Sequence, residues 1–189
     1  MGVICQIISD SHSEQTVHQL LEQSKPRLIF HSHLVELPHL TEKIIVFDEE
    51  DAQITSETFS DWVYAEEEAN IEIQPATEND VAVILYTSGS TGLPNGIPLT
   101  HKMLFQSAGK VANTFHWTDN DLFLATSELD SMSGLRNTAL ATLFAGCPIV
   151  IPNLAVSNKV FSIVESIRNQ QITLLSTTPA LLKQFVQLG

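Results

Sequence analysis

Basic residues, cysteine and long apolar runs are all scarce in this sequence, and each shortage excludes a class of protein. The 189 residues contain 9 Lys and Arg against 22 Asp and Glu, a formal net charge of −13. Such a chain repels polyphosphate, so we expect no nucleic-acid partner and no attachment to an anionic membrane surface. The two cysteines, Cys5 and Cys147, are too few for a disulfide scaffold and favour a reduced, cytoplasmic setting. No apolar run approaches the roughly 18 residues that span a bilayer, so we expect no transmembrane segment.

The rest of the composition is that of a globular protein. Hydrophobic residues make up 43% and charged residues 16% of the chain, a balance that argues against disorder. Five histidines lie within the first 39 residues: His12, His18, His31, His33 and His39. Their spacing matches no zinc pattern, so we predict no metal site among them.

Charge is distributed unevenly along the chain. Residues 1–80 hold 17 acidic and 3 basic side chains, whereas residues 81–189 hold 5 and 6. Residues 48–80 alone contain twelve acids and no Lys or Arg, which is typical of a solvated connection. We therefore predict an N-terminal α/β segment at 1–47, an acidic connecting segment at 48–80 with a short helix around 59–65, and an α/β segment at 81–189.

Short apolar runs alternate with helical patterns along most of the chain. Strands are predicted at 3–8, 28–30, 44–47, 81–85, 122–125, 147–151 and 172–175. Helices are predicted at 135–145 and after four capping residues: Ser11 (paired with Glu14), Thr100, Ser157 and Thr178. The apolar face of the Thr100 helix is predicted to run through Leu104, Ala108, Val111 and Phe115. The alternation predicts an α/β fold, a mostly parallel sheet with flanking helices.

The most informative stretch runs from Tyr86 to Gly96 and reads Tyr-Thr-Ser-Gly-Ser-Thr-Gly-Leu-Pro-Asn-Gly. It follows a continuously apolar strand and precedes the Thr100 helix. Its glycines, at 89, 92 and 96, let the backbone adopt unusual dihedrals and approach a ligand closely. Its hydroxyls and free amides can donate to phosphate oxygens. We predict a phosphate-binding loop, with a flexible turn as the alternative. A Walker-type loop and the dinucleotide fingerprint are both excluded, because neither glycine pattern is present.

Residues 80–96, together with Leu99-Thr100-His101, resemble the signature of the adenylate-forming enzymes. That superfamily comprises AMP-forming acyl-CoA synthetases, peptide-synthetase adenylation domains and luciferases. Segments 2–8, 143–151 and 172–182 resemble other parts of the family more loosely. The 189 residues lack the family's downstream adenine and ribose motifs, its hinge and its small C-terminal domain with the catalytic Lys. The resemblance therefore implies an interior part of the large N-terminal domain of the adenylate-forming fold, with no catalytic residue of its own.

The resemblance also implies a two-step reaction. A carboxylate attacks the α-phosphorus of ATP, pyrophosphate leaves, and a thiol of coenzyme A or of phosphopantetheine then takes the acyl group from the adenylate. Mg²⁺ normally shares the phosphate charge. The implied ATP phosphate-binding residues are Thr87, Ser88, Gly89, Ser90, Thr91, Gly92 and Asn95. The family usually has Lys where this chain has Asn95, so we expect weaker nucleotide binding.

Candidate residues for the substrate pocket are Asp130, Met132 and Thr177. Asp130 is the position that could face a substrate amine, and a solvated loop acid is the alternative reading of it. The acid itself stays open among fatty, aryl and amino acids, as does the choice between free coenzyme A and a carrier protein.

The expected parent enzyme is an AMP-forming acyl-CoA synthetase. It would be a ligase of fatty acid metabolism or one that activates another carboxylic acid. The alternatives are an amino-acid or carrier-protein adenylation domain and, from a different class, a non-catalytic α/β module with a degenerate nucleotide loop. The 189 residues alone are expected to be inactive in adenylate formation, and apolar surface that the parent normally covers is expected to drive self-association.

Overall fold

The computed structural model describes residues 2–9, 11–31, 43–46, 57–58, 64, 75–87, 94–152 and 159–188. The chain forms two compact units, one of Met1–Ile7 with Gln74–Gly189 and one of Ile8–Ile73. Most of residues 48–80 lie outside the described residues, so the division of the chain by charge stays a prediction. The helix predicted around 59–65 falls there too, apart from Tyr64.

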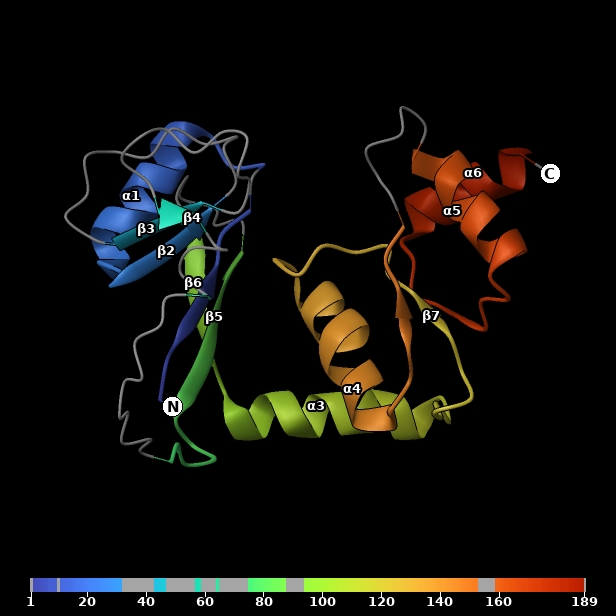
Figure 1. Cartoon of the computed structure of the whole chain (residues 1–189), viewed down its shortest axis with the longest axis horizontal. Helices are drawn as coiled ribbons and strands as arrows, with labels where there is room; N and C mark the ends of the chain where they lie inside the picture. The colour runs from blue at the N-terminus through green and yellow to red at the C-terminus, as the bar shows by residue number, and fades with distance from the viewer. Residues whose placement is uncertain are drawn as a thin grey trace. The chain divides into compact units, whose positions relative to one another are not determined.

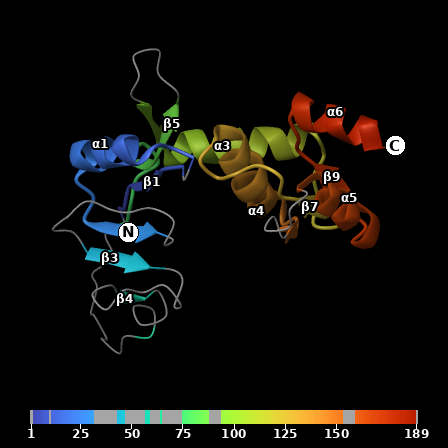
Figure 2. The same ribbon diagram turned by 90° about the horizontal axis from the view of Figure 1, so that it is seen from above.

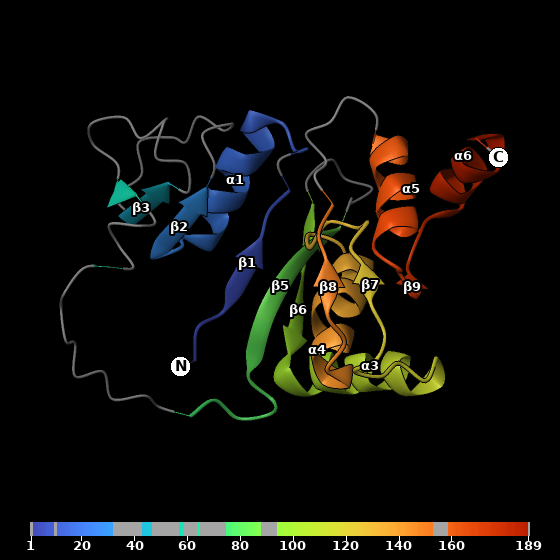
Figure 3. The same ribbon diagram turned by 45° about the vertical axis from the view of Figure 1, so that its right-hand side comes forward.

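The smaller unit combines one helix with a parallel sheet (Figures 2 and 3). Its elements are α1 (Glu14–Ser24), β2 (Leu28–His31), β3 (Lys43–Val46) and β4 (Glu57–Thr58). The strands pair in the order β2-β3-β4, and both pairings are parallel. Val17 and Leu21 of α1 pack against Ile29 of β2 and Ile8 to form a small core.

The cap of α1 differs from the sequence prediction. Ser13, not Ser11, precedes the helix, and the backbone N–H of Thr16 donates to its hydroxyl at 3.3 Å. The hydroxyl of Ser11 lies 2.8 Å from that of Ser9 instead. The predicted pairing of Ser11 with Glu14 was wrong because Glu14 is itself the first helical residue, which requires the cap to lie immediately before it.

The larger unit contains two sheets and most of the helices (Figures 1 and 3). The first sheet has the order β1-β5-β6, from β1 (Cys5–Ile7), β5 (Val81–Thr87) and β6 (Asn95–Thr100). The second has the order β8-β7-β9, from β7 (Phe123–Leu124), β8 (Ile149–Val150) and β9 (Leu174–Leu175). Among the described strands only β5 and β6 pair antiparallel. The α/β class and the mostly parallel sheet are confirmed.

The helices of this unit come between its strands or after them along the chain. They are α3 (His101–Thr114), the π-helix η2 (Gly134–Ala141), α4 (Thr142–Ala145), α5 (Lys159–Asn169) and α6 (Pro179–Leu188). The caps predicted at Thr100 and Thr178 are confirmed, since their hydroxyls accept from the backbone N–H groups of Met103 and Leu181. Gly146 ends α4 in the left-handed conformation, with φ of 70°. The cap predicted at Ser157 lies outside the described residues.

Strand β6 has no counterpart in the sequence prediction. Pro98 lies within it and opposes Ile84 of β5, and proline cannot donate a hydrogen bond to a neighbouring strand. The sheet accommodates it because β6 is an edge strand of the described sheet, the position where proline is tolerated. The chain after the glycine-rich stretch thus returns along β5 as a hairpin before α3 begins.

Helix α3 buries a face rotated from the predicted one. Leu104 and Ala108 are buried as expected, but the face continues through Gly109 and Ala112. Phe115 is 67% exposed and follows the end of the helix. The rotation follows from contact with α4, where a Cβ on Gly109 would come within 2.9 Å of the Phe144 ring. In Figure 1, α4 lies against the middle of α3.

Two residues outside the strands tie β7 to β9. The hydroxyl of Thr173 donates to Asp121 at 2.8 Å and accepts from the backbone N–H of Leu122 at 2.9 Å. The backbone N–H of Thr118 donates to the other carboxylate oxygen of Asp121 at 2.8 Å. The hydrogen bond from Thr173, followed by the one from Thr118, holds the pKa of the Asp121 carboxyl below its ordinary value of 3.8.

We expect Asp121→Asn to reduce the loss of stability at acid pH. A carboxyl whose folded pKa is depressed stabilises the fold fully above its unfolded pKa near 3.8, and this contribution disappears as pH falls through the lower folded value. Urea midpoints at pH 6 and pH 3 measure this contribution. The midpoint of Asp121→Asn should be lower than that of the unaltered protein at pH 6, and it should fall less between pH 6 and pH 3. Asp119→Asn, which changes an exposed neighbour, is the control. Parallel pH curves for Asp121→Asn and the unaltered protein would contradict the expectation.

Candidate functional site

The β5–β6 hairpin holds the two ends of the predicted phosphate loop. Thr87 is the last residue of β5 and Asn95 the first of β6, and the two oppose each other in the strand register. Both are exposed. The other predicted phosphate ligands, Ser88, Gly89, Ser90, Thr91 and Gly92, lie outside the described residues. The structure therefore brings together the flanks of the predicted loop.

Gly96 is important in the hairpin because it has no side chain. We expected it to supply an unusual backbone conformation, but among the described glycines only Gly146 has positive φ. Instead, a Cβ on Gly96 would come within 3.1 Å of Ile84 and 3.2 Å of the Tyr86 ring. The side chain of Tyr86 thus lies across the backbone of the opposite strand, a known way to support a glycine in a sheet.

Tyr86 also links the hairpin to β1. Its hydroxyl donates to the side-chain oxygen of Gln6 at 3.0 Å. Partial burial raises the pKa of Tyr86 above its ordinary value of 10.0, so the phenol stays protonated and keeps this donor at neutral pH. The strand that leads into the loop is therefore fixed on both of its edges.

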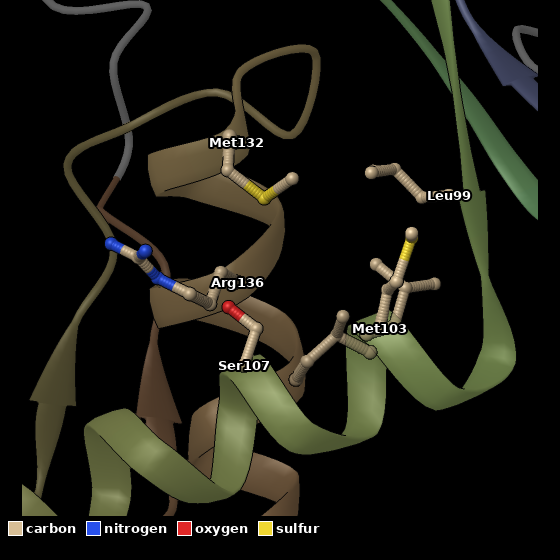
Figure 4. Close-up of a pocket in the computed structure, with 7 residues that line it drawn as sticks. Leu99, Met103, Ser107, Met132 and Arg136 are labelled. Atoms are coloured by element: carbon tan, nitrogen blue, oxygen red, sulfur yellow. The ribbon is translucent and has the colours of Figure 1, made fainter.

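A cavity of about 240 Å³ lies between β6, α3 and the residues that begin η2 (Figure 4). Its lining residues are Leu99, Met103, Leu104, Ser107, Met132, Arg136 and Leu140. Leu99 is in the same strand as Asn95, four residues or about 13 Å further along. An apolar cavity with a few polar groups is the usual form of a small-molecule site, and this one adjoins the hairpin that carries the predicted loop.

Of the three predicted pocket residues, the structure places Met132 on this cavity. Asp130 is half-buried in the turn before η2 and does not line it. Thr177 lies between β9 and α6, and its hydroxyl oxygen is buried with no hydrogen-bond partner among the described residues. The roles suggested for Asp130 and Thr177 stay predictions.

Arg136 and its neighbours form a polar cluster that the sequence did not reveal. The Nε of Arg136 donates to the Asn137 side-chain oxygen at 2.9 Å, and the Asn137 amide donates to the Ser176 hydroxyl at 2.9 Å. Thr126 donates to the carbonyl of Ser176. Thr126 and Ser176 follow β7 and β9, and ligands of parallel sheets bind at these carboxyl ends. The spacing of four residues from Met132 to Arg136 on a helical segment was the available signal.

The described residues contain neither a metal cluster nor a membrane span. No group of three or more His, Cys, Asp or Glu side chains among them is placed to hold a metal ion. No helix in the described ranges has the length and apolar character needed to cross a bilayer.

Comparison with known proteins gives matches along the whole chain. A family model described as AMP-binding enzyme matches residues 1–189. The 2-succinylbenzoate–CoA ligase of Bacillus velezensis is 31% identical over 123 residues, which cover 65% of this chain and 24% of that protein. Tyrocidine synthase 3 of Brevibacillus parabrevis is 27% identical over 176 residues, which cover 93% of this chain and 2% of that protein.

A solved structure extends the likeness to the fold. The O-succinylbenzoate coenzyme A synthetase of Bacillus subtilis, in complex with AMP, superposes with a TM-score of 0.72 at 21% identity. The match covers 99% of this chain and 45% of that one. This chain spans less than half the length of each of these three proteins. The family match covers every residue, and the fold agrees with it, so the chain belongs to the family of AMP-binding, adenylate-forming enzymes.

Proposed function

We propose that the chain forms part of an enzyme that uses ATP to activate a carboxylic acid as its adenylate and then transfers the acyl group to a thiol. Family members are AMP-forming ligases. The observation that carries the proposal is the hairpin: Thr87 and Asn95 oppose each other at its open end, and the same strand β6 contributes Leu99 to the apolar cavity. A phosphate loop and an acyl pocket would then share one rigid element.

In this proposal the residues from Thr87 to Gly92, with Asn95, hold the β- and γ-phosphates of ATP. Backbone amides and hydroxyls aimed at phosphate oxygens stabilise the charge that develops as pyrophosphate leaves. Thr87 and Asn95 also offer neutral oxygens of the kind that Mg²⁺ accepts, and this ion commonly keeps waters and substrate phosphates as its other ligands. These residues therefore fit an ion that arrives with ATP and shares its phosphate charge.

The acid would occupy the cavity beside Met132, and Asp130 and Thr177 are further candidates for contact with it. Coenzyme A or a carrier-bound phosphopantetheine is the proposed acceptor, in a cytoplasmic ligase of fatty or other carboxylic acids. We propose that these 189 residues alone do not catalyse adenylate formation, and that they self-associate through apolar surface such as Met103, Phe105 and Leu143. ATP binding is therefore the more direct test of the loop.

We expect Thr91→Ala to weaken ATP binding about 10- to 100-fold, because a hydrogen bond to a charged group is worth about 1.5–3 kcal/mol. Asn95→Lys should tighten binding, since it returns a positive charge next to the phosphates. Isothermal calorimetry with ATP and Mg²⁺ measures both effects. Thr114→Ala, at the exposed end of α3, should leave the affinity unchanged.

Two outcomes of this calorimetry would contradict the proposal. If Thr91→Ala and the unaltered protein bind ATP with equal affinity, the loop does not bind the nucleotide. Absence of ATP binding even in Asn95→Lys would favour the non-catalytic module, in which the glycine-rich stretch is only a turn.

A further inference from the structure

We propose that the hydroxyl of Thr142 holds η2 in its π-helical form and thereby positions the side chains that this segment presents to the cavity. The functional meaning of this inference rests on the proposed function, because it takes the cavity beside Met132 as the place of the acid. Helix η2 passes directly into α4 at Thr142 and contributes Arg136 and Leu140 to the cavity lining. A π-helix is rare, and where one occurs it is frequently found at a functional site.

The change of helix type at Thr142 leaves one backbone carbonyl without a donor. In a π-helix each N–H donates to the carbonyl five residues earlier, and in an α-helix to the one four residues earlier, so one carbonyl is skipped where the first passes into the second. The hydroxyl of Thr142 lies 2.6 Å from the carbonyl oxygen of Thr138 and 2.9 Å from that of Ala139. The Ala139 carbonyl also accepts from the backbone N–H of Thr142. We therefore assign the hydroxyl to the Thr138 carbonyl.

Burial makes this hydroxyl important for the choice between the two helix types. Thr142 is 0% exposed and Thr138 is 8% exposed, so water is not available as a replacement donor. A buried carbonyl without a partner is costly, and native structures nearly always satisfy it. A continuous α-helix over the same residues would skip no carbonyl and would not need the hydroxyl. The hydroxyl of Thr142 therefore stabilises the π form relative to the α form.

The helix type decides where the residues before Thr142 lie. Helix α4 is held in place on α3, where the rings of Phe144 and Phe105 pack with centroids 5.3 Å apart. A change of η2 to an α-helix would therefore move the residues before the junction by one α-helical step, about 100° of rotation and about 1.5 Å of rise. Met132 would turn away from the cavity. Asn137 would leave the Ser176 hydroxyl, to which it now donates at 2.9 Å.

The methyl resonance of Met132 in ¹³C NMR tests this inference on the intact protein. Thr142→Val replaces the hydroxyl by a methyl group and should move the ratio of π to α form about 5- to 150-fold toward α, the effect of an unpaired buried carbonyl. The Met132 resonance should shift with it. Because Met132 lies beyond the opposite end of η2, a purely local role of Thr142 would leave this resonance unchanged. Thr142→Ser keeps the donor and should keep the resonance.

Ser166→Ala is the matched control. The Ser166 hydroxyl donates to the Ser162 carbonyl at 2.9 Å, which is the same kind of bond within the regular α-helix α5. No carbonyl is skipped there, so its loss should leave the Met132 resonance where it is.

A deletion provides a second measurement, which also applies if Thr142→Val alone does not fold. Removal of Ala139 takes out the additional residue of the wide helix, so η2 can become α-helical while Met132 keeps its place. In this background Thr142→Val should lower the urea midpoint no more than Ser166→Ala does in the unaltered protein, because no carbonyl then depends on the hydroxyl.

Three results would overturn the proposal. A Met132 resonance that stays unchanged in Thr142→Val, or that Thr142→Ser moves equally, would show that the hydroxyl does not set the helix type. An equal loss of urea midpoint for Thr142→Val with and without Ala139 would give Thr142 a local role only. None of these measurements uses ATP or an acid, so failure here is distinct from failure of the proposed function.

Discussion

Gly134→Ala should lower the free energy of unfolding by about 3 kcal/mol, the upper end of what overpacking a buried site costs. Gly134 is buried at the start of η2, and a Cβ there would overlap the backbone carbonyl of Glu128. The neighbouring backbone has little room to move, because the hydroxyl of Ser131 donates to that carbonyl at 3.0 Å and accepts from the Gly134 N–H at 3.0 Å. Relief of the overlap requires the turn and the helix to separate.

Urea denaturation of Gly134→Ala beside Gly2→Ala measures the effect. Gly2 has no atom within 4 Å of the added methyl position, so this variant should leave the midpoint unchanged. A midpoint for Gly134→Ala equal to that of Gly2→Ala would show that the turn yields freely. Because Met132 lies between Ser131 and Gly134, the destabilised variant should also lose part of its affinity for any ligand of the cavity.

Phe123→Ala should cost about 3–5 kcal/mol, as expected for an aromatic side chain removed from a closed core. Phe123 is fully buried on β7, the central strand of its sheet, and its ring packs against Trp117 with centroids 5.2 Å apart. Because β7 is paired with β8 and β9 on its two edges, its backbone is held in place, which limits how far the core can collapse into the space.

Thermal unfolding followed by tryptophan fluorescence checks this second expectation, since Trp117 reports on the loss directly. Phe115→Ala is the matched control, because Phe115 is 67% exposed and its loss leaves no cavity. A cost below about 1 kcal/mol for Phe123→Ala would mean that the second sheet contributes little to the stability of the unit.

Local patterns in the sequence predicted the class of fold and most of the elements. The strand at 81–85 and the helix caps at Thr100 and Thr178 depend only on residues that are neighbours in the sequence. They could therefore be predicted from the sequence alone. Strand β6 was not predicted, because a proline such as Pro98 normally interrupts a strand. Pro98 is acceptable here only because β6 lies at the edge of the described sheet. The rotation of the α3 face depends on contact between Gly109 and Phe144, which are remote in sequence.

The candidate site was predictable only in part, because some of its residues are brought together only by the fold. The glycine- and hydroxyl-rich stretch is contiguous, so its chemistry can be read directly from the residue types. The cavity is assembled from a strand, a helix and a π-helix. Met132 was inferred from resemblance, and Arg136 lies four residues further along the same helical segment, whereas Ser107 joins the cavity only through packing. The link from Asn137 to Ser176, across 39 residues, has no local signal at all.

The antiparallel pairing of Thr87 with Asn95 has a consequence for the thermodynamics of the phosphate binding that we propose. Strand pairing fixes these two Cα atoms about 5 Å apart whether or not a ligand is present. The entropy of closing the connecting segment is therefore lost during folding rather than during binding. A nucleotide bound as we propose would then meet a segment whose two ends are already tethered, so more of the interaction free energy would appear as affinity.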